Sequence, residues 1–358
     1  MIHTLINSIK PLDKSAMDSA KKRQSCLAKP PGSLGTLEDI SLRLAGITGK
    51  VHNTIEKKHL LVFASDNGVT EEGVSSAPKS VTLKQAVNLT KAKTGAAVLA
   101  KHFGCGITVC DVGIDGDVSG TSVLDRKISF GTNNMAKGPA MTREQAIKAI
   151  VTGAELAKET EADILGIGEM GIGNTTTASA VLSVLTDCDA DAVTGRGGGI
   201  TDKAFRRKKQ VIKKAIEVNN PGREDTVDVL SKVGGFDIAA MCGAFLGGAA
   251  SGRPIVVDGF ISAVAALCAV RLCPAVSDYL IASHDSLEKG YKLAIKEIGI
   301  KPMLSLGMRL GEGSGCPLAF QIVDAACAVI NNMATFDEAD IDDNYLEEIR
   351  QSEDIWEN

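Results

Sequence analysis

The chain has 358 residues, of which 44% are hydrophobic and 23% are charged, and its formal net charge is −5. This length predicts one large domain with a smaller one, while the slightly acidic balance and the 4% aromatic content argue against a nucleic-acid partner. Nine cysteines without a CxxC pair or a metal-ligand spacing favour free thiols in a reducing cytosol and predict no metal site. We therefore expect a cytoplasmic protein.

The N-terminal 58 residues are predicted to form a helical arm rather than part of a sheet. Apolar residues recur mostly at helical spacing in Ser33–Ile47, after a break at Lys29–Gly32, and no strand pattern occurs in this part of the chain. The first residues lack the apolar core of a signal peptide. The most apolar stretch, Ile238–Cys273, is interrupted by Ser251–Pro254, so neither piece reaches the roughly 18 residues of a membrane span.

A repeating pattern of short apolar strand, loop with an acid and a glycine, and helix begins at Leu60 and predicts an α/β fold. Such alternation is typical of parallel βαβ units, which together form a doubly wound, Rossmann-like sheet. The six predicted strands are Leu60–Ala64, Ile107–Val112, Asp163–Gly168, Pro254–Gly259, Tyr279–Ser283 and Met303–Leu306. Acids at strand ends gather at one sheet edge, where ligands bind. The acidic segment after Phe336 is predicted to be a solvated helical tail that extends through Trp356.

The loop Gly307–Gly315, with the sequence GMRLGEGSG, is a candidate reaction centre. Four glycines surround a single carboxylate, Glu312. The loop follows a predicted strand and precedes a helix-compatible stretch, Pro317–Met333, so it would lie at the carboxyl end of a parallel strand. Glycines let the backbone approach a ligand closely. Taken alone, the pattern fits a turn with a solvated glutamate equally well.

The segment Gly166–Gly171 has the form GxGxxG, with Asp189 and Asp191 about 20 residues further on, and raises a dinucleotide-binding hypothesis. Glu169 lies within this loop and argues against the hypothesis, because a carboxylate would repel a pyrophosphate. Glycines that serve only strand-to-helix packing are the alternative. The next residues, Asn174–Thr177, predict a helix start capped by side chains, which suits a single phosphate or a sugar hydroxyl.

A second glycine loop, Thr194–Gly199, precedes a basic helical stretch. The basic residues are Lys203, Arg206, Arg207, Lys208 and Lys209. The loop lacks the GK[ST] of a triphosphate-binding loop, but one or two of these cations would suffice for a phosphomonoester, with the others on a solvated face. Ser283–Ser286, with the sequence SHDS, lacks the GxSxG that accompanies a nucleophilic serine. Ser286 is therefore predicted to cap a helix near a phosphate.

Eight motifs occur in an order that resembles a known enzyme family. They are KPPGSLG (Lys29–Gly35), EEGVSSAPKSVT (Glu71–Thr82), GEMGIGNTT (Gly168–Thr176), TGRGGG (Thr194–Gly199), SKVGGFD (Ser231–Asp237), DGF (Asp258–Phe260), SHDSLEKG (Ser283–Gly290) and MRLGEGSG (Met308–Gly315). Together they resemble the nicotinate-nucleotide–dimethylbenzimidazole phosphoribosyltransferases of cobalamin biosynthesis. The resemblance implies a homodimer without a cofactor. It also implies a six-stranded sheet domain, residues 59–333, and a small helical domain from residues 1–58 and 334–358.

The resemblance further implies a reaction and its site residues. Phosphoribose would pass from nicotinate mononucleotide to a benzimidazole, giving an α-ribazole phosphate and nicotinate. Glu312 would be the general base and Glu169 a second carboxylate at the reacting centre. The base pocket would be lined by Ala77, Gln85, Met170, Met308 and Leu310. The phosphoribose would be held by Gly171, Lys208, Asp258, Gly259 and Ser286. Asn174 and Thr175, from the predicted helix start, would belong to the same site.

This chemistry needs few groups. The donor's leaving group is a cationic pyridinium that departs neutral, so the main requirement is a carboxylate that removes the azole proton. Attack opposite the leaving group inverts C1′. Ala77 stands where some members of the family have serine, which leaves the acceptor open to other azoles or phenols. The remaining alternatives are a non-catalytic ligand-binding homologue and, on GxGxxG alone, an NAD-dependent oxidoreductase.

Overall fold

The computed structural model describes residues 2–346, and its centre is a parallel sheet in the order β3-β2-β1-β4-β5-β6-β7. The strands are β1 (Lys58–Ser65), β2 (Gly106–Gly113), β3 (Leu124–Asp125), β4 (Ile164–Met170), β5 (Ile255–Val257), β6 (Leu280–His284) and β7 (Pro302–Leu304). The six predicted strands are confirmed. The predicted strand count of six was too low by one, because β3 contributes only two residues beside β2, too few to give a recognisable pattern.

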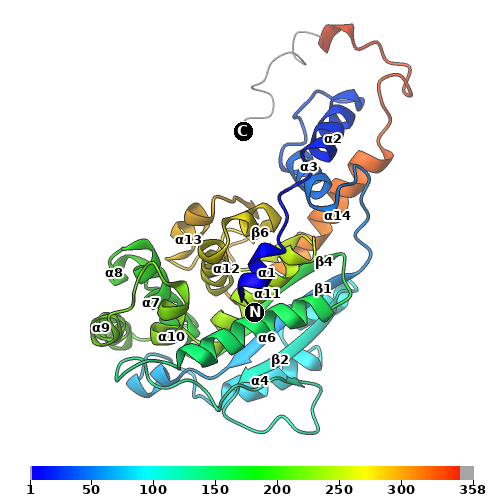
Figure 1. Ribbon diagram of the computed structural model, residues 1–358. Helices are drawn as coiled ribbons and strands as arrows, with labels where there is room; N and C mark the ends of the chain where they lie inside the picture. The colour runs from blue at the N-terminus through cyan, green and yellow to red at the C-terminus, as the bar shows by residue number, and fades with distance from the viewer. Residues whose placement is uncertain (1, 347–358) are drawn as a thin grey trace.

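Helices cover both faces of the sheet, which confirms the doubly wound prediction. Alternate residues of a strand point to opposite faces: Leu61 and Phe63 of β1 enter the core shared with α6, α11 and α12, whereas Leu60 and Val62 enter the core shared with α4, α5 and α14. In Figure 1, α6 and α11 lie side by side across one face. The covering helices are α4 (Val81–Thr90), α5 (Gly95–His102), α6 (Arg143–Glu159), α11 (Phe236–Ala250), α12 (Phe260–Leu272) and α14 (Cys316–Asn332).

Further helices surround the carboxyl edge of the sheet and the connections between strands. They are α7 (Asn174–Thr186), α8 (Ala190–Val193), α9 (Asp202–Asn219), α10 (Thr226–Val233) and α13 (Tyr291–Ile298), with 3₁₀ turns at Gly68–Glu72 and Pro274–Tyr279. α7 packs against α9, α10 and α12. This packing brings the basic stretch of α9 beside the start of α7.

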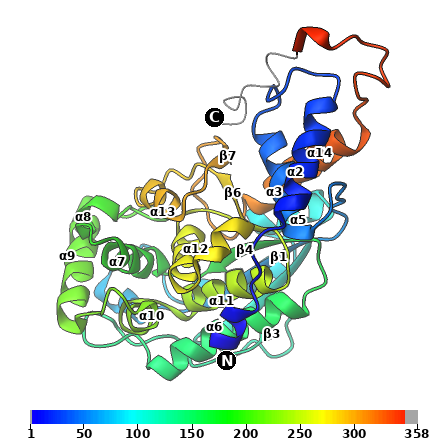
Figure 2. The ribbon, with the colours of Figure 1, turned by 45° about the horizontal axis from the view of Figure 1, so that its top comes forward.

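A small helical lobe stands apart from the sheet and contains segments from both ends of the chain (Figures 1 and 2). Its helices are α2 (Lys14–Cys26) and α3 (Thr36–Thr48), which pack together and against the far end of α14. Leu27 and Thr335 form an antiparallel bridge that ties the two ends together. The first helix, α1 (Ile2–Asn7), instead packs against α6 and α11 of the sheet domain.

The C-terminal segment is described as far as residue 346. It contains a single 3₁₀ turn, Asn344–Leu346, after the bridge at Thr335. The helical piece predicted through Trp356 lies outside the described residues. Within residues 2–346, every helix is too short or too polar to cross a membrane.

The strand order creates a crevice between β1 and β4. From this pair the sheet extends through β2 on one side and β5 on the other. In such a sheet the loops that follow the two central strands lead to opposite faces, and ligands bind in the space between them at the carboxyl edge. Glu169 lies at this end of β4, and Asp66 and Asn67 follow β1.

Candidate active site

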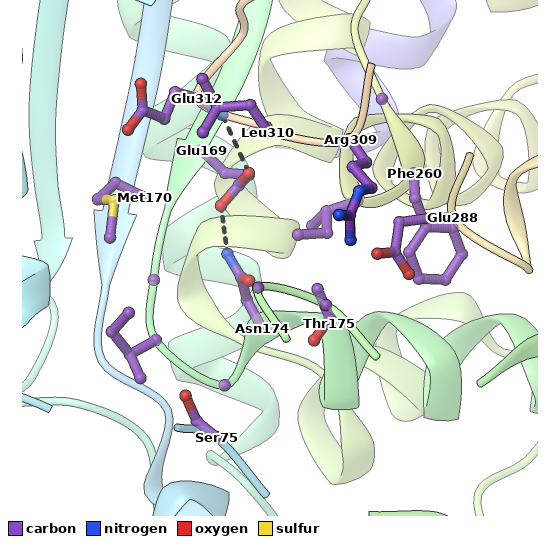
Figure 3. Close-up of a pocket in the computed structure, with 18 of the residues that line it drawn as sticks. Ser75, Glu169, Met170, Asn174, Thr175, Phe260, Glu288, Arg309, Leu310 and Glu312 are labelled. Carbon is purple, nitrogen blue, oxygen red and sulfur yellow. Dashed lines mark hydrogen bonds between the residues drawn. The ribbon is translucent and has the colours of Figure 1, made fainter. Parts of the chain in front are cut away.

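A cavity of about 250 Å³ opens at the β1–β4 switch point. Its walls come from residues 74–77, 169–175, 196–198, 258–262 and 309–312, together with Ile200, His284, Ser286 and Glu288. Residues from six of the eight sequence motifs therefore meet at one place, although these motifs are spread over more than half of the chain; KPPGSLG and SKVGGFD contribute none of the lining residues. Figure 3 shows Glu169 near the middle, with Met170 and Glu312 on one side and Arg309 and Glu288 on the other.

Glu312 has an unusual backbone conformation for a residue with a side chain. Its φ angle is +61°, between Gly311 at +88° and Gly313 at +81°. A left-handed non-glycine residue costs about 1–3 kcal/mol and persists where the surrounding structure holds it. The Glu312 side chain is 6% exposed, and its Oε2 accepts a hydrogen bond of 3.3 Å from the backbone N–H of Ala96. The loop thus directs a buried carboxylate into the cavity wall.

Asp258 and Gly168 hold this loop in place. The Asp258 carboxylate accepts from the backbone N–H of Gly315 at 2.7 Å and from that of Gly313 at 3.1 Å. Gly168 allows close approach, because a Cβ at this position would lie only 2.6 Å from the Gly313 Cα. Gly168 of β4 therefore allows packing against the Glu312 loop, which agrees with the strand-to-helix packing alternative rather than with dinucleotide binding.

Glu169 is linked by hydrogen bonds to Glu312 on one side and to Asn174 on the other. Its Oε1 accepts from the backbone N–H of Glu312 at 3.3 Å, and its Oε2 accepts from the Asn174 side-chain amide. Burial raises the pKa of Glu169 to about 8; the Asn174 hydrogen bond opposes this rise, and the negative charge of Asp237 adds to it. The two glutamates are therefore parts of one buried network.

Asp237 lies behind Glu169 and was not assigned a role by the sequence, although it ends the SKVGGFD motif. The Asn174 amide donates to Asp237 Oδ2 at 3.1 Å as well as to Glu169, so it bridges two carboxyl groups. Asp237 is fully buried, and burial raises its pKa to about 6. Its other oxygen accepts from the backbone N–H of Ile238 in the first turn of α11, where the helix dipole favours an anion.

The predicted side-chain cap of α7 was wrong. The helix begins at Asn174 after Gly173, which has φ +95° and contributes no side chain. The Asn174 side-chain amide instead donates to the buried carboxyl groups of Glu169 and Asp237, and Thr175 Oγ1 accepts from Lys208 Nζ at 2.7 Å. Both side chains thus make contacts at the cavity rather than with the N–H groups of their own helix.

Lys208 differs from the rest of the basic cluster on α9. It is 1% exposed, whereas Lys203, Arg206 and Arg207 are exposed to solvent. Burial lowers the pKa of Lys208 to about 8, and the negative charge of Glu288 opposes this shift. Because a buried ammonium needs an anionic partner, its position behind Thr175 suits a bound phosphate. The exposure of the other basic residues agrees with the prediction from the sequence that most of the cluster lies on a solvated face.

The prediction that Ser286 caps a helix was wrong. The next helix, α13, begins at Tyr291 after Gly290, and Ser286 lies in the preceding loop. Its Oγ accepts from the backbone N–H of Glu288 at 3.4 Å. Ser286 nevertheless lines the cavity, and its Oγ would lie 3.7 Å from a Cβ placed on Gly259.

The residues expected to bind the base divide into two groups. Ala77, Met170 and Leu310 line the cavity, as does Glu312. Gln85 on α4 and Met308 lie outside the lining. The Gln85 side chain accepts from Asn88 at 3.0 Å, and the backbone carbonyl of Met308 accepts from the N–H of Leu287 at 3.1 Å.

Comparisons with known proteins agree with this geometry. A family model described as phosphoribosyltransferase matches residues 9–341, which defines the class. The nicotinate-nucleotide–dimethylbenzimidazole phosphoribosyltransferase of Clostridium perfringens (strain ATCC 13124) is 52% identical over 99% of both chains. The protein of the same name from Clostridium tetani is 49% identical over 98% of both chains. A crystal structure of the Thermus thermophilus enzyme of that name is 36% identical, covers 93% of this chain and 100% of that one, and has a TM-score of 0.88.

The chain belongs to the nicotinate-nucleotide–dimethylbenzimidazole phosphoribosyltransferase family. The resemblance inferred from the eight motifs is thereby confirmed, and the oxidoreductase alternative is not favoured.

Proposed function

We propose that the protein transfers phosphoribose from nicotinate mononucleotide to 5,6-dimethylbenzimidazole or a related base. The products are α-ribazole 5′-phosphate and nicotinate, with inversion at C1′, and the reaction contributes to assembly of the cobalamin nucleotide loop. The observation that supports this most is the hydrogen-bonded pair Glu312–Glu169 in a cavity whose wall also contains Thr175, backed by the buried cation of Lys208.

In this proposal the two glutamates have separate tasks. Glu312 removes the N–H proton of the incoming azole while the other azole nitrogen attacks C1′. Glu169 acts as an anion beside C1′, where positive charge develops as the pyridinium leaves. The hydrogen bond from the backbone N–H of Glu312 joins the Glu169 carboxylate to the loop that contains Glu312. Nicotinate departs with a neutral ring nitrogen, so the site needs no acid to protonate it.

Substrate contacts are assigned to opposite parts of the cavity. The phosphoribose is held by residues from β4, α7, α9 and the loops after β5 and β6. These are Gly171, Asn174, Thr175, Lys208, Asp258, Gly259 and Ser286. The base is assigned to Ala77, Met170 and Leu310, with Gln85 and Met308 as further members that do not line the cavity in the structure.

The part of the cavity assigned to the acceptor is mostly apolar. Ala77 lines the cavity without a polar group, so the benzo ring of the acceptor meets apolar surface and a flexible methionine, Met170. Such a pocket discriminates methyl groups weakly, because one methyl is worth about 1–3 kcal/mol. We propose graded use of several azoles, with a phenol as the second candidate class of acceptor.

The remaining assignments follow the family. We propose a cytoplasmic homodimer with a catalytic domain of residues 59–333 and a small domain formed by residues 1–58 and 334–358. The antiparallel bridge between Leu27 and Thr335, which joins the two terminal segments, supports the small domain.

The test is nicotinate release from nicotinate mononucleotide, followed by chromatography, with a panel of benzimidazoles, adenine and phenols. Release that depends on an azole or phenol acceptor is expected. An azole methylated at the nitrogen to be deprotonated is the matched control and should fail, since it cannot give a neutral product. The absence of release with every acceptor would overturn the proposal, and turnover of the N-methyl azole would remove the reason for a base.

A further inference from the structure

His284, at the end of β6, has no task in the mechanism above, yet it lines the cavity and is only 2% exposed. The two nitrogens of its ring have different surroundings. Nδ1 lies beside Ser283 and Asp258, next to the backbone of Gly315. Nε2 lies on the side of Gly259, where a Cβ would be 3.9 Å away.

The neighbours of Nδ1 determine which nitrogen has the proton. Ser283 Oγ lies 3.0 Å from Nδ1, and the Ser283 hydroxyl donates to the Asp258 carbonyl at 3.2 Å. A hydroxyl has one hydrogen, so Oγ is left to accept a proton from Nδ1. The Asp258 carboxylate, 3.9 Å from Nδ1, favours the same arrangement. In the neutral ring Nε2 is then an acceptor.

This acceptor is available to a ligand. Within residues 2–346, Nε2 has no hydrogen-bond partner, and Gly259 has no side chain that would cover it. His284 lies between two parts of the cavity wall. One is Ser286, whose Oγ also approaches Gly259, and the other is the Glu312 loop, which hydrogen-bonds to Asp258.

We propose that Nε2 of His284 accepts a hydrogen bond from a ribose hydroxyl of the phosphoribosyl donor, and this inference rests on the proposed function. The other groups of the substrates do not match an acceptor. Phosphate oxygens are themselves acceptors, and the azole N–H is directed to Glu312. A ribose hydroxyl is the donor that remains, and it lies between the phosphate and the base, as His284 lies between Ser286 and the Glu312 loop.

The test compares the wild type with His284→Ala and His284→Gln. For each protein, kcat/KM for nicotinate release is measured with nicotinate mononucleotide, its 2′-deoxy and 3′-deoxy analogues, and the riboside without phosphate. Loss of the recognised hydroxyl should cost the wild type about 3- to 10-fold more than it costs His284→Ala, the usual worth of one hydrogen bond. His284→Gln should restore part of this difference, since its amide oxygen can accept.

The inference would be overturned if each deoxy donor lowered kcat/KM by the same factor in the wild type and in His284→Ala. A difference confined to the donor without phosphate would also overturn it, because it would assign His284 to the phosphate. His59→Gln is the matched control: His59 lies near the start of β1, at the opposite edge of the sheet, where its Nε2 pairs with Thr108 Oγ1 at 2.9 Å. It should behave as the wild type.

Failure of the proposed function is distinguishable from failure of this inference. The former gives no nicotinate release by the wild type with any acceptor. If only this inference fails, the wild type still releases nicotinate, but the effect of removing a donor hydroxyl is the same with and without His284. Dissociation constants of the same donors, measured by calorimetry without an acceptor, give the comparison independently of turnover, and a 3- to 10-fold difference that disappears in His284→Ala is again expected.

Discussion

The buried carboxyl of Glu169 and the buried ammonium of Lys208 should make phosphoribosyl transfer sensitive to pH in both directions. Burial raises the pKa of Glu169 to about 8 and lowers that of Lys208 to about 8. The proposed mechanism uses Glu169 as an anion and Lys208 as a cation. Glu169 loses its charge as the pH falls through its pKa, and Lys208 loses its charge as the pH rises through its own. We therefore expect a bell-shaped profile of kcat/KM with a maximum at about pH 8.

The two pKa values set the size of the effect. With both at about 8, about 25% of the free enzyme has the required charges at pH 8, and about 3% has them at pH 6.5 or 9.5. The value of kcat/KM should thus be about 8-fold lower at both ends of this range. The assay is the initial rate of nicotinate release with the donor far below its KM.

Two variants separate the limbs of this profile. Glu169→Gln should lose the acid limb. Lys208→Arg should lose the alkaline limb, because a guanidinium remains charged throughout the range. A flat wild-type profile, or an acid limb that persists unchanged in Glu169→Gln, would refute the reasoning.

Three further expectations follow. Asp237→Asn removes a negative charge behind Glu169 and should move the acid limb to lower pH; an unchanged limb would exclude electrostatic coupling through this network. Asp258→Asn should lower the free energy of unfolding in urea by about 1–3 kcal/mol, since an amide leaves one of two buried backbone N–H groups unpaired, whereas Asp115→Asn in an exposed ion pair should cost less than about 1 kcal/mol. Activity should survive EDTA, because the donor has no pyrophosphate that needs a cation; complete inactivation that metal reverses would contradict this.

The sequence was most informative where local pattern decides structure. Six apolar strands with glycine loops predicted the parallel sheet, and the density of glycines around Glu312 marked its loop. The left-handed φ of Glu312 and the approach of Gly313 to Gly168 explain this density. β3 escaped recognition because two residues cannot show a period.

The errors arose where tertiary contacts override local preference. Asn174 looks like a helix cap, but two buried carboxyl groups compete for its amide. Ser286 looks like another cap, yet the helix begins only at Tyr291. Asp237 could not be assigned a role, because its partner Asn174 is distant in the chain and the link exists only after α7 and α11 have packed.

The most direct test of the central claim is the rate of α-ribazole 5′-phosphate formation by Glu312→Gln, with the anomer identified by nuclear magnetic resonance. The wild type should give the α product from nicotinate mononucleotide and dimethylbenzimidazole. The variant should bind the donor normally but form product roughly 10²–10⁴-fold more slowly, the usual contribution of a positioned base. A near-normal rate in the variant at neutral pH, or a β product from the wild type, would contradict the account.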